Sequence, residues 1–294
     1  MANILIAGCG DVGITLGVNL AKAGHRVWGL RRRPSPLPVE LHPLVADLAD
    51  PASLRALPRG LDYVFYTAAP DGFSETSYQA VYVDGIHNLL TALYETGQNL
   101  HRVFLTSSTS VYAQHQGEWV DEDSPAEAMS FSARSIRTGE NLLWQGNFPA
   151  TVVRFGGIYG SGRTRLLESV RQGTATCVET LFTNRIHRDD AAAVLHHLMT
   201  VPAPAALYLG VDDEPAPQCQ VMRWLAKQLG VPEPAVTATV GKLRRACAPT
   251  NDVVITVYGP AAFNCATPII KRVTKRCYSV LNRAANRPPT LTPG

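Results

Sequence analysis

The chain has 294 residues, of which 46% are apolar and 17% charged, a composition typical of globular rather than disordered or fibrous proteins. Its length fits one large α/β domain or two small ones. The formal net charge of +3 is too small for nucleic acid or an acidic membrane to be the main partner. Neither nucleic acid nor a membrane is therefore expected as a partner.

The sequence contains no candidate membrane span, because no stretch approaches the roughly 18 apolar residues that one needs. The N-terminus lacks a basic region and its apolar run ends at Gly8, which indicates a buried strand rather than a signal peptide. The cysteines form no CxxC pair and no zinc spacing with histidine, so we expect no metal site. They stand at Cys9, Cys177, Cys219, Cys247, Cys265 and Cys277. We expect buried small side chains in a reducing cytoplasm rather than a disulfide framework.

Apolar runs alternate with helical stretches along the chain, the pattern of a doubly wound parallel sheet with helices on both faces. The expected strands are near-continuously apolar, as strands covered on both faces should be. They are Asn3–Ala7, Arg26–Leu30, Leu44–Asp47, Asp62–Ala68, Arg102–Thr106, Ala150–Arg154 and Ala206–Val211. The expected helices are 12–23, closed by Gly24, then Tyr78–Thr96, Ser132–Trp144, Asp189–Thr200 and Gln220–Leu229. We predict an α/β fold with a small C-terminal substrate-binding part.

The junction of the first strand and first helix carries the pattern G-x-G-x-x-G, formed by Gly8, Gly10 and Gly13. The first glycine permits a tight turn, the second lets a pyrophosphate approach the backbone, and the third allows close packing of helix and strand. The helix beginning at Asp11 and Val12 offers free N–H groups to phosphates. This context predicts a Rossmann-like dinucleotide site.

The end of the second strand indicates which dinucleotide binds. An acid there normally accepts a bond from the ribose 2′-hydroxyl of NAD, whereas this chain has Arg31 and Arg32. Guanidinium groups match a 2′-phosphate, so NADP is expected, with NAD still possible and a solvated basic loop as the other interpretation. Asp47 is placed to meet the adenine edge, and Ala68 and Ala69 are small enough to lie beside the cofactor.

Three later segments, 104–112, 154–163 and 184–190, resemble motifs of one protein family. Together with the glycine turn they are similar to the extended branch of the short-chain dehydrogenase/reductase superfamily, the NAD(P)-dependent epimerase/dehydratase proteins. The resemblance runs from about residue 3 to about residue 235. It implies that Ser108, after Thr106 on the fifth strand, bonds the reacting oxygen, and that Phe155 and Gly156 pass under the nicotinamide.

The resemblance fails at the family's catalytic Tyr-x-x-x-Lys pair. Placing the acid that follows the pair on Glu140 puts Ile136 at the lysine position and Ser132 at the tyrosine position. A shift of one residue gives Ser135 and Phe131 instead. Losing a positioned acid/base typically costs about 10²–10⁴ in rate. The chain is thus expected to be an atypical member.

Other residues are candidates for the missing roles. Arg134 could hold the ribose or a phosphate but cannot titrate. Tyr112 is the candidate proton donor, although an aromatic packed at a strand end is the alternative interpretation. Tyr159, Arg163 and His187 are expected at the substrate, with a structural role as the alternative for Tyr159 and His187. In a further departure, Asp84 is matched to the position where the family has an active-site Asn.

The predicted organisation has three parts. Residues 1–160 form an NAD(P)-binding domain, and residues 161–241 complete the sheet and form the substrate cleft. Residues 242–294 are an atypical basic tail, which contains nine Lys and Arg residues and a single acid, Asp252. A divergent extension, an interaction tail, disorder and a reading-frame shift in the source sequence are all open. The abrupt change of composition fits the frame shift best.

The leading hypothesis is a cytoplasmic, NADP-binding oxidoreductase of the epimerase/dehydratase type, acting on a small polar or nucleotide-sugar-like substrate. The alternative is a non-catalytic redox sensor whose occupancy by NADP alters a surface for a protein partner. The broken Tyr/Lys pair favours the sensor, whereas Ser108 and the glycine segment favour the enzyme. A homodimer is compatible with either.

Overall fold

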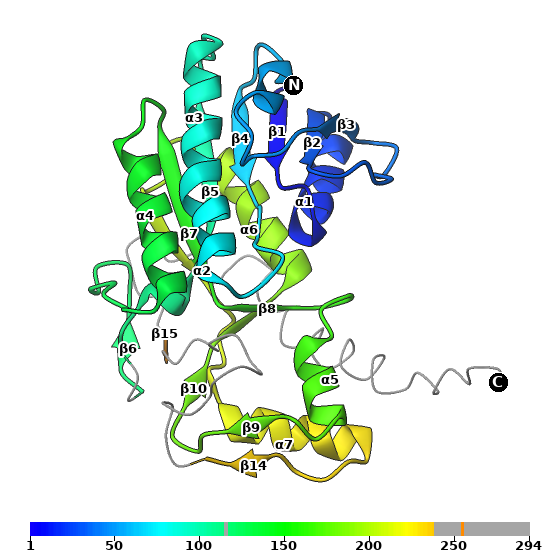
Figure 1. The fold of residues 1–294 in the computed structure, drawn as a ribbon, viewed down its shortest axis with the longest axis vertical. Helices are drawn as coiled ribbons and strands as arrows, with labels where there is room; N and C mark the ends of the chain where they lie inside the picture. Colours follow the sequence, from blue (N-terminus) through cyan, green and yellow to red (C-terminus); the bar gives the residue numbers. More distant parts are fainter. Residues whose placement is uncertain (115–116, 238–253, 256–294) are drawn as a thin grey trace, which may run out of the picture.

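The computed structural model describes residues 1–114, 117–237 and 254–255. In this part of the chain seven parallel strands form one sheet, in the spatial order β12-β7-β5-β4-β1-β2-β3 (Figure 1). The strands are β1 Asn3–Ala7, β2 Arg26–Arg31, β3 His42–Val45, β4 Tyr63–Tyr66, β5 Arg102–Ser108, β7 Ala150–Phe155 and β12 Leu207–Gly210. The predicted α/β fold with a doubly wound sheet is confirmed.

Helices cover both faces of the sheet. One face packs against α1 (Asp11–Lys22) and α6 (Arg188–Thr200), and the other against α3 (Gly85–Glu95) and α4 (Phe131–Gln145). Side chains alternate between the two faces of a strand, so Ile4 lies in the first core and Leu5 in the second. Both cores are needed to bury the apolar runs on which the fold prediction rests.

The strand β3 begins and ends two residues before the predicted Leu44–Asp47. The reason lies at Asp47, whose backbone N–H donates to Ser53 Oγ at 2.9 Å instead of to a neighbouring strand. Ser53 opens a 3₁₀ turn, η1 (Ser53–Ala56), that leads away from the sheet. Asp47 therefore lies beyond the strand, at the edge where the parallel strands end.

The helix predicted over Tyr78–Thr96 is present over residues 75–95, but it contains a π-helical turn that was not predicted. It consists of α2 (Glu75–Gln79), a π-helical turn η2 (Ala80–Asp84) and α3. Tyr66 of β4 donates its phenol hydrogen to Val81 O at 2.5 Å, which satisfies a carbonyl within this turn. A Cβ at Gly139 of α4 would lie 2.3 Å from Tyr82 O, so only glycine lets α4 pack this closely. Contacts distant in sequence thus hold the turn.

A smaller cluster follows the sheet strand β7 (Figure 1). It contains α5 (Arg165–Arg171), α7 (Gln218–Leu229), β9 (Thr176–Cys177) and β14 (Ala235–Val236), and its core includes Val170 and Met222. A disulfide joins Cys177 to Cys219, which corrects the expectation that these cysteines are reduced. Chain spacing gives no sign of this pairing, because packing of α7 on β9 brings together residues 42 positions apart. Cys9 is free and buried.

Short elements complete the described part of the chain. They are the 3₁₀ turn η3 (Thr109–Val111) and the strands β6 (Trp119–Val120), β8 (Gly157–Tyr159), β10 (Phe182–Thr183), β11 (Arg185–His187), β13 (Ala216–Pro217) and β15 (Val254–Ile255). β15 pairs in parallel with β6. The expectations for the rest of the tail 242–294 lie outside the described residues. None of the helices in the described ranges combines the length and hydropathy needed to traverse a lipid bilayer.

Candidate functional site

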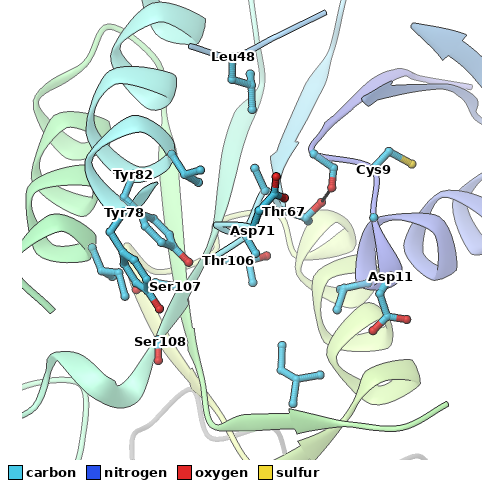
Figure 2. Close-up of a pocket in the computed structure, with 18 of the residues that line it drawn as sticks. Cys9, Asp11, Leu48, Thr67, Asp71, Tyr78, Tyr82, Thr106, Ser107 and Ser108 are labelled. Carbon is cyan, nitrogen blue, oxygen red and sulfur yellow. Dashed lines mark hydrogen bonds between the residues drawn. The ribbon is translucent and has the colours of Figure 1, made fainter. Parts of the chain in front are cut away.

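A cleft of about 690 Å³ lies at the carboxyl ends of the parallel strands (Figure 2). It sits where β1 pairs with β2 on one side and β4 on the other, the point at which the chain reverses its direction across the sheet. Such switch points are the usual ligand sites of open α/β sheets. The predicted site residues that line it are Gly8, Gly10, Asp11, Val12, Arg31, Arg32, Asp47, Ala68, Ala69, Thr106, Ser108, Phe155, Gly156 and Arg163.

The glycine turn has the geometry that its pattern predicts. Gly8 has a φ of +82°, and a Cβ there would lie 2.3 Å from Ala68 Cα. A Cβ at Gly13 would lie 2.8 Å from Thr67 Oγ1, so this glycine allows α1 to approach the residue that follows β4. Gly10 has only Gly8 O, at 3.8 Å, near its missing Cβ. The space in front of Gly10 is open to the cleft.

These features fit the pyrophosphate of a dinucleotide. The N-terminus of α1 faces the cleft, and no side chain caps its free N–H groups. Asp11, the first residue of the helix, places a carboxylate there, and Arg163 Nε at 2.5 Å and Arg188 Nη1 at 3.0 Å balance its charge. The residues of this end of the cleft are therefore compatible with an anionic ligand.

Both predicted arginines, at the end of β2, border the cleft. Arg31 is half-buried, and Arg32 is exposed and forms an ion pair with Asp71, which also lines the cleft. Asp71 follows β4 by five residues and was not predicted, since an exposed loop acid carries no sequence signal of its own. Two acids, Asp47 and Asp71, therefore line the same cleft as the arginines.

Ser108 ends β5 and lies at the wall of the cleft (Figure 2). Its Oγ accepts the backbone N–H of Ser110 at 3.2 Å, which begins the turn η3 and fixes the side chain. Thr106 and Ser107 of the same strand also line the cleft. Three consecutive hydroxyl-bearing residues at this strand end therefore line the cleft.

A buried ion-pair cluster lies directly behind Ser108. Glu140 of α4 is fully buried and accepts hydrogen bonds from Ser107 Oγ at 2.5 Å and from Arg154 Nε and Nη2 at 3.0 and 2.8 Å. Arg137 Nη1 also donates to it at 2.5 Å. Burial lowers the pKa of Arg154, but the hydrogen bonds and charge of Glu140 more than compensate and raise it. The cluster ties α4 to the ends of β5 and β7.

Tyr112, the predicted proton donor, belongs to this cluster and not to the cleft. Its phenol hydrogen goes to Asp121 O at 2.9 Å, and its oxygen accepts from Arg154 Nη1 at 2.8 Å. Burial raises the pKa of Tyr112, and the charge of Arg154 opposes this. Tyr112 thus packs at the strand end and does not line the cleft.

The helix α4 clarifies the broken catalytic pair. Ser132 and Ile136 both line the cleft, whereas Ser135 turns away and donates to Phe131 O at 3.0 Å. The two residues that the alignment on Glu140 selects therefore both face the cleft. Arg134 is exposed, donates to Met129 O at 2.7 Å and does not line the cleft.

Two other expectations are changed by the structure. Asp84 is exposed and accepts from Gln79 Nε2 at 3.3 Å, so the residue of its segment that reaches the cleft is Tyr82. Tyr159 and His187 are absent from the cleft lining; their rings pack together with centroids 5.3 Å apart. His187 Nδ1 accepts the N–H of Asp189 at 3.3 Å and caps α6.

Several cleft residues had not been predicted at all. Thr67 donates to Gly8 O at 2.9 Å and supports the glycine turn, and Cys9 lies within that turn. Burial raises the pKa of the Cys9 thiol to about 11, so it stays protonated at neutral pH. Tyr78 of α2 reaches the cleft from the opposite side. Among the described residues no cluster of His, Cys, Asp and Glu could hold a metal ion.

Comparison with known proteins agrees with this geometry. A 3-diazoavenalumate denitrifying reductase of a Streptomyces species is 28% identical over 260 residues, covering 79% of this chain and 83% of the relative. A structure from Methylobacillus flagellatus, assigned as an NAD-dependent epimerase/dehydratase, is 32% identical with a TM-score of 0.75 and covers 97% of this chain and 99% of its own. MoeE5 in complex with UDP-glucuronic acid and NAD has the same fold, with a TM-score of 0.72, 20% identity and coverage of 92% and 93%.

The family model for NAD dependent epimerase/dehydratase proteins matches residues 4–202, which include the sheet strands β1 to β7, the glycine turn and Ser108. The chain belongs to the NAD-dependent epimerase/dehydratase family.

Proposed function

We propose that the protein is an NADP-dependent oxidoreductase that acts on a small polar or nucleotide-linked sugar substrate. The observation that best supports this proposal is that one cleft extends from the glycine turn at Gly8 to Ser108. A bound nicotinamide nucleotide supplies hydride transfer. The N–H groups of α1 would bind its pyrophosphate, Arg31 and Arg32 its ribose phosphate, and Ser108 would hold the substrate oxygen.

Relatives support the substrate class. Structures with the same fold are MoeE5 with UDP-glucuronic acid and NAD, MoeE5 with UDP-glucose and NAD, and WbmG with NAD and UDP. The Streptomyces relative is named a reductase. We extend nucleotide-sugar chemistry to this chain, with residues from 161 onwards as the substrate side of the cleft.

The test of the proposal is a panel of UDP-sugars, including UDP-glucose and UDP-glucuronic acid, followed by the absorbance of reduced nicotinamide. We expect slow turnover, because the positions of the catalytic pair hold Ser132 and Ile136. Ser108→Ala should lower kcat further by about 10²–10³, since a hydrogen bond to the developing oxyanion is lost. Ser35→Ala, an exposed serine outside the cleft, is the matched control. Turnover that Ser108→Ala leaves unchanged would remove Ser108 from the mechanism.

A non-catalytic NADP sensor is the second candidate, favoured by the residues that occupy the positions of the missing pair. Ser132 Oγ lies 3.1 Å from Ser130 Oγ, and Ile136 has no ionisable group. The sensor hypothesis predicts that NADP binds tightly while no member of the substrate panel is turned over. Measurable turnover that depends on Ser108 would contradict it.

The cofactor preference follows from Arg31 and Arg32. A charge-assisted hydrogen bond to a 2′-phosphate contributes roughly 1.5–3 kcal/mol, part of which solvent screens at exposed Arg32. We expect NADPH to bind at least about tenfold tighter than NADH, with a wider gap at low salt. Calorimetric titration of both nucleotides into wild type and an Arg31→Ala/Arg32→Ala variant measures this.

Asp71 provides a second arm for the same titration. Its carboxylate pairs with Arg32 and competes with a phosphate, so Asp71→Asn should strengthen NADPH binding and leave NADH nearly unchanged. Asp50→Asn, at an exposed loop outside the cleft lining, is the control. Equal affinities for both nucleotides in the wild type would exclude these arginines from the site.

A further inference from the structure

Two phenol groups in the cleft have no role in the function proposed so far. Tyr78 of α2 and Tyr82 of η2 both line the cleft, and Figure 2 shows their rings directed toward the end of β5. Tyr66 and Tyr112, in contrast, donate their phenol hydrogens to backbone carbonyls. Within the described part of the chain, no hydrogen bond is formed by the phenol oxygen of Tyr78 or Tyr82.

The π-helical turn η2 sets the direction of these side chains. π-turns occur as single-turn insertions in helices and are frequent at functional sites. Here Tyr66 bonds Val81 O within the turn, and Gly139 makes room for Tyr82 O. The turn is therefore fixed by β4 and α4, and it separates the face of α2 from that of α3.

Tyr78 lies beside the position where the family's tyrosine is missing. Its ring packs edge-on against Phe131 and Phe73, with centroids 5.6 Å apart in both cases, and 5.7 Å from the ring of Tyr82. Phe131 directly precedes Ser132, which occupies the tyrosine position on α4. The aromatic cluster thus brings a phenol from a different helix to this place.

Resting on the proposed function, we propose that Tyr78 is the catalytic acid/base that replaces the absent tyrosine. In reduction, a hydride from the reduced nicotinamide forms the new C–H bond at the substrate carbonyl carbon. The carbonyl oxygen takes the proton of Tyr78 O–H and becomes a hydroxyl, and the remaining phenolate regains a proton from water. Oxidation runs in reverse, with the phenolate accepting the hydroxyl proton. Ser108 holds the same oxygen.

The charges around Tyr78 suit this role. Burial raises the pKa of Tyr78, which keeps the phenol protonated and able to donate at neutral pH, and the positive charge of Arg165 opposes this shift. The neighbouring phenol of Tyr82 has a raised pKa as well, chiefly through burial, and stays neutral. Arg165, at the start of α5, carries the positive charge that favours the phenolate form of Tyr78, whereas Ile136 at the family's lysine position has no charge.

The first test needs no substrate. Tyrosines labelled at Cζ are observed by NMR in the complexes with NADP⁺ and NADPH, and Tyr78 is identified as the resonance missing from Tyr78→Phe. Because the oxidised nicotinamide is positively charged, Tyr78 should ionise about 1–3 pH units lower with NADP⁺ than with NADPH. Tyr94→Phe, at a residue 63% exposed on α3, should leave that difference intact.

The second test uses any sugar nucleotide that the panel turns over. Tyr78→Phe keeps the ring packing, so its NADPH affinity should match wild type while kcat falls by about 10²–10⁴. The inference would be overturned if the Tyr78 resonance titrated identically in both complexes. It would also be overturned if only the resonance of Tyr82, identified by its loss in Tyr82→Phe, differed between them. Failure of NADP⁺ to bind in calorimetry would instead overturn the proposed function, and this inference with it.

Discussion

Replacing Glu140 by Gln should lower the free energy of unfolding by about 3–5 kcal/mol, the typical cost of removing one partner from a buried ion pair. The new amide would direct hydrogens at Arg137 or Arg154, which already donate to this position. For a chain of this size we expect the melting temperature to fall by roughly 6–20 °C in a calorimetric scan.

The matched control for this substitution is Glu168→Gln. Glu168 also pairs with an arginine three residues away, Arg171, but both side chains are substantially exposed. Exposed pairs contribute about 0–1 kcal/mol, so this variant should unfold close to the wild-type temperature. Equal melting temperatures for the two variants would show that the Glu140 cluster does not support the end of β5.

Substitution of Gly8 and of Gly10 by alanine should have different effects. Comparing the two variants distinguishes a loss of stability from a loss of cofactor affinity. At Gly8 a side chain meets the backbone of Ala68 at 2.3 Å and an unfavourable positive φ, so Gly8→Ala should lose both stability and NADPH binding. At Gly10 the space is open, so Gly10→Ala should melt like wild type without cofactor. Its methyl group faces the proposed pyrophosphate, and NADPH affinity should fall at least about tenfold.

Melting curves without cofactor and calorimetric titration with NADPH measure the two quantities independently. A Gly10→Ala variant that binds NADPH as tightly as wild type would mean that the phosphates do not approach this turn. Normal stability of Gly8→Ala would show that Ala68 can move away without cost.

The sheet could be predicted because its determinants are local. Continuous apolar runs such as Asn3–Ala7 have few alternatives to a strand covered on both faces, and the structure places β1 at these residues. The glycine turn is also specified locally, by three residues within six positions. Ser108 was found through the family resemblance of segment 104–112, and the structure places it at the cleft.

Features that depend on distant contacts were missed. The π-helical turn at Ala80–Asp84 contacts Tyr66 and Gly139, which lie on other elements, while the sequence of the segment itself has a helical period throughout. Tyr112 was predicted at the cleft because it follows Ser108 by four residues, but Arg154 and Asp121 hold it elsewhere. Sequence distance to a site residue did not predict spatial position after a turn.

The π-helical turn also has a consequence for how this protein can change over time. An α-helix advances by about 100° per residue, so one surplus residue resets the rotation of everything that precedes it. The buried face of α3, with Ile86 and Leu89, is held against the sheet, while α2 carries Tyr78 at an angle of its own. Deleting the surplus residue would swing Tyr78 away from the cleft without disturbing α3. An insertion or deletion in this turn can therefore change which side chains of α2 face the cleft, while the packing of α3 on the sheet is kept.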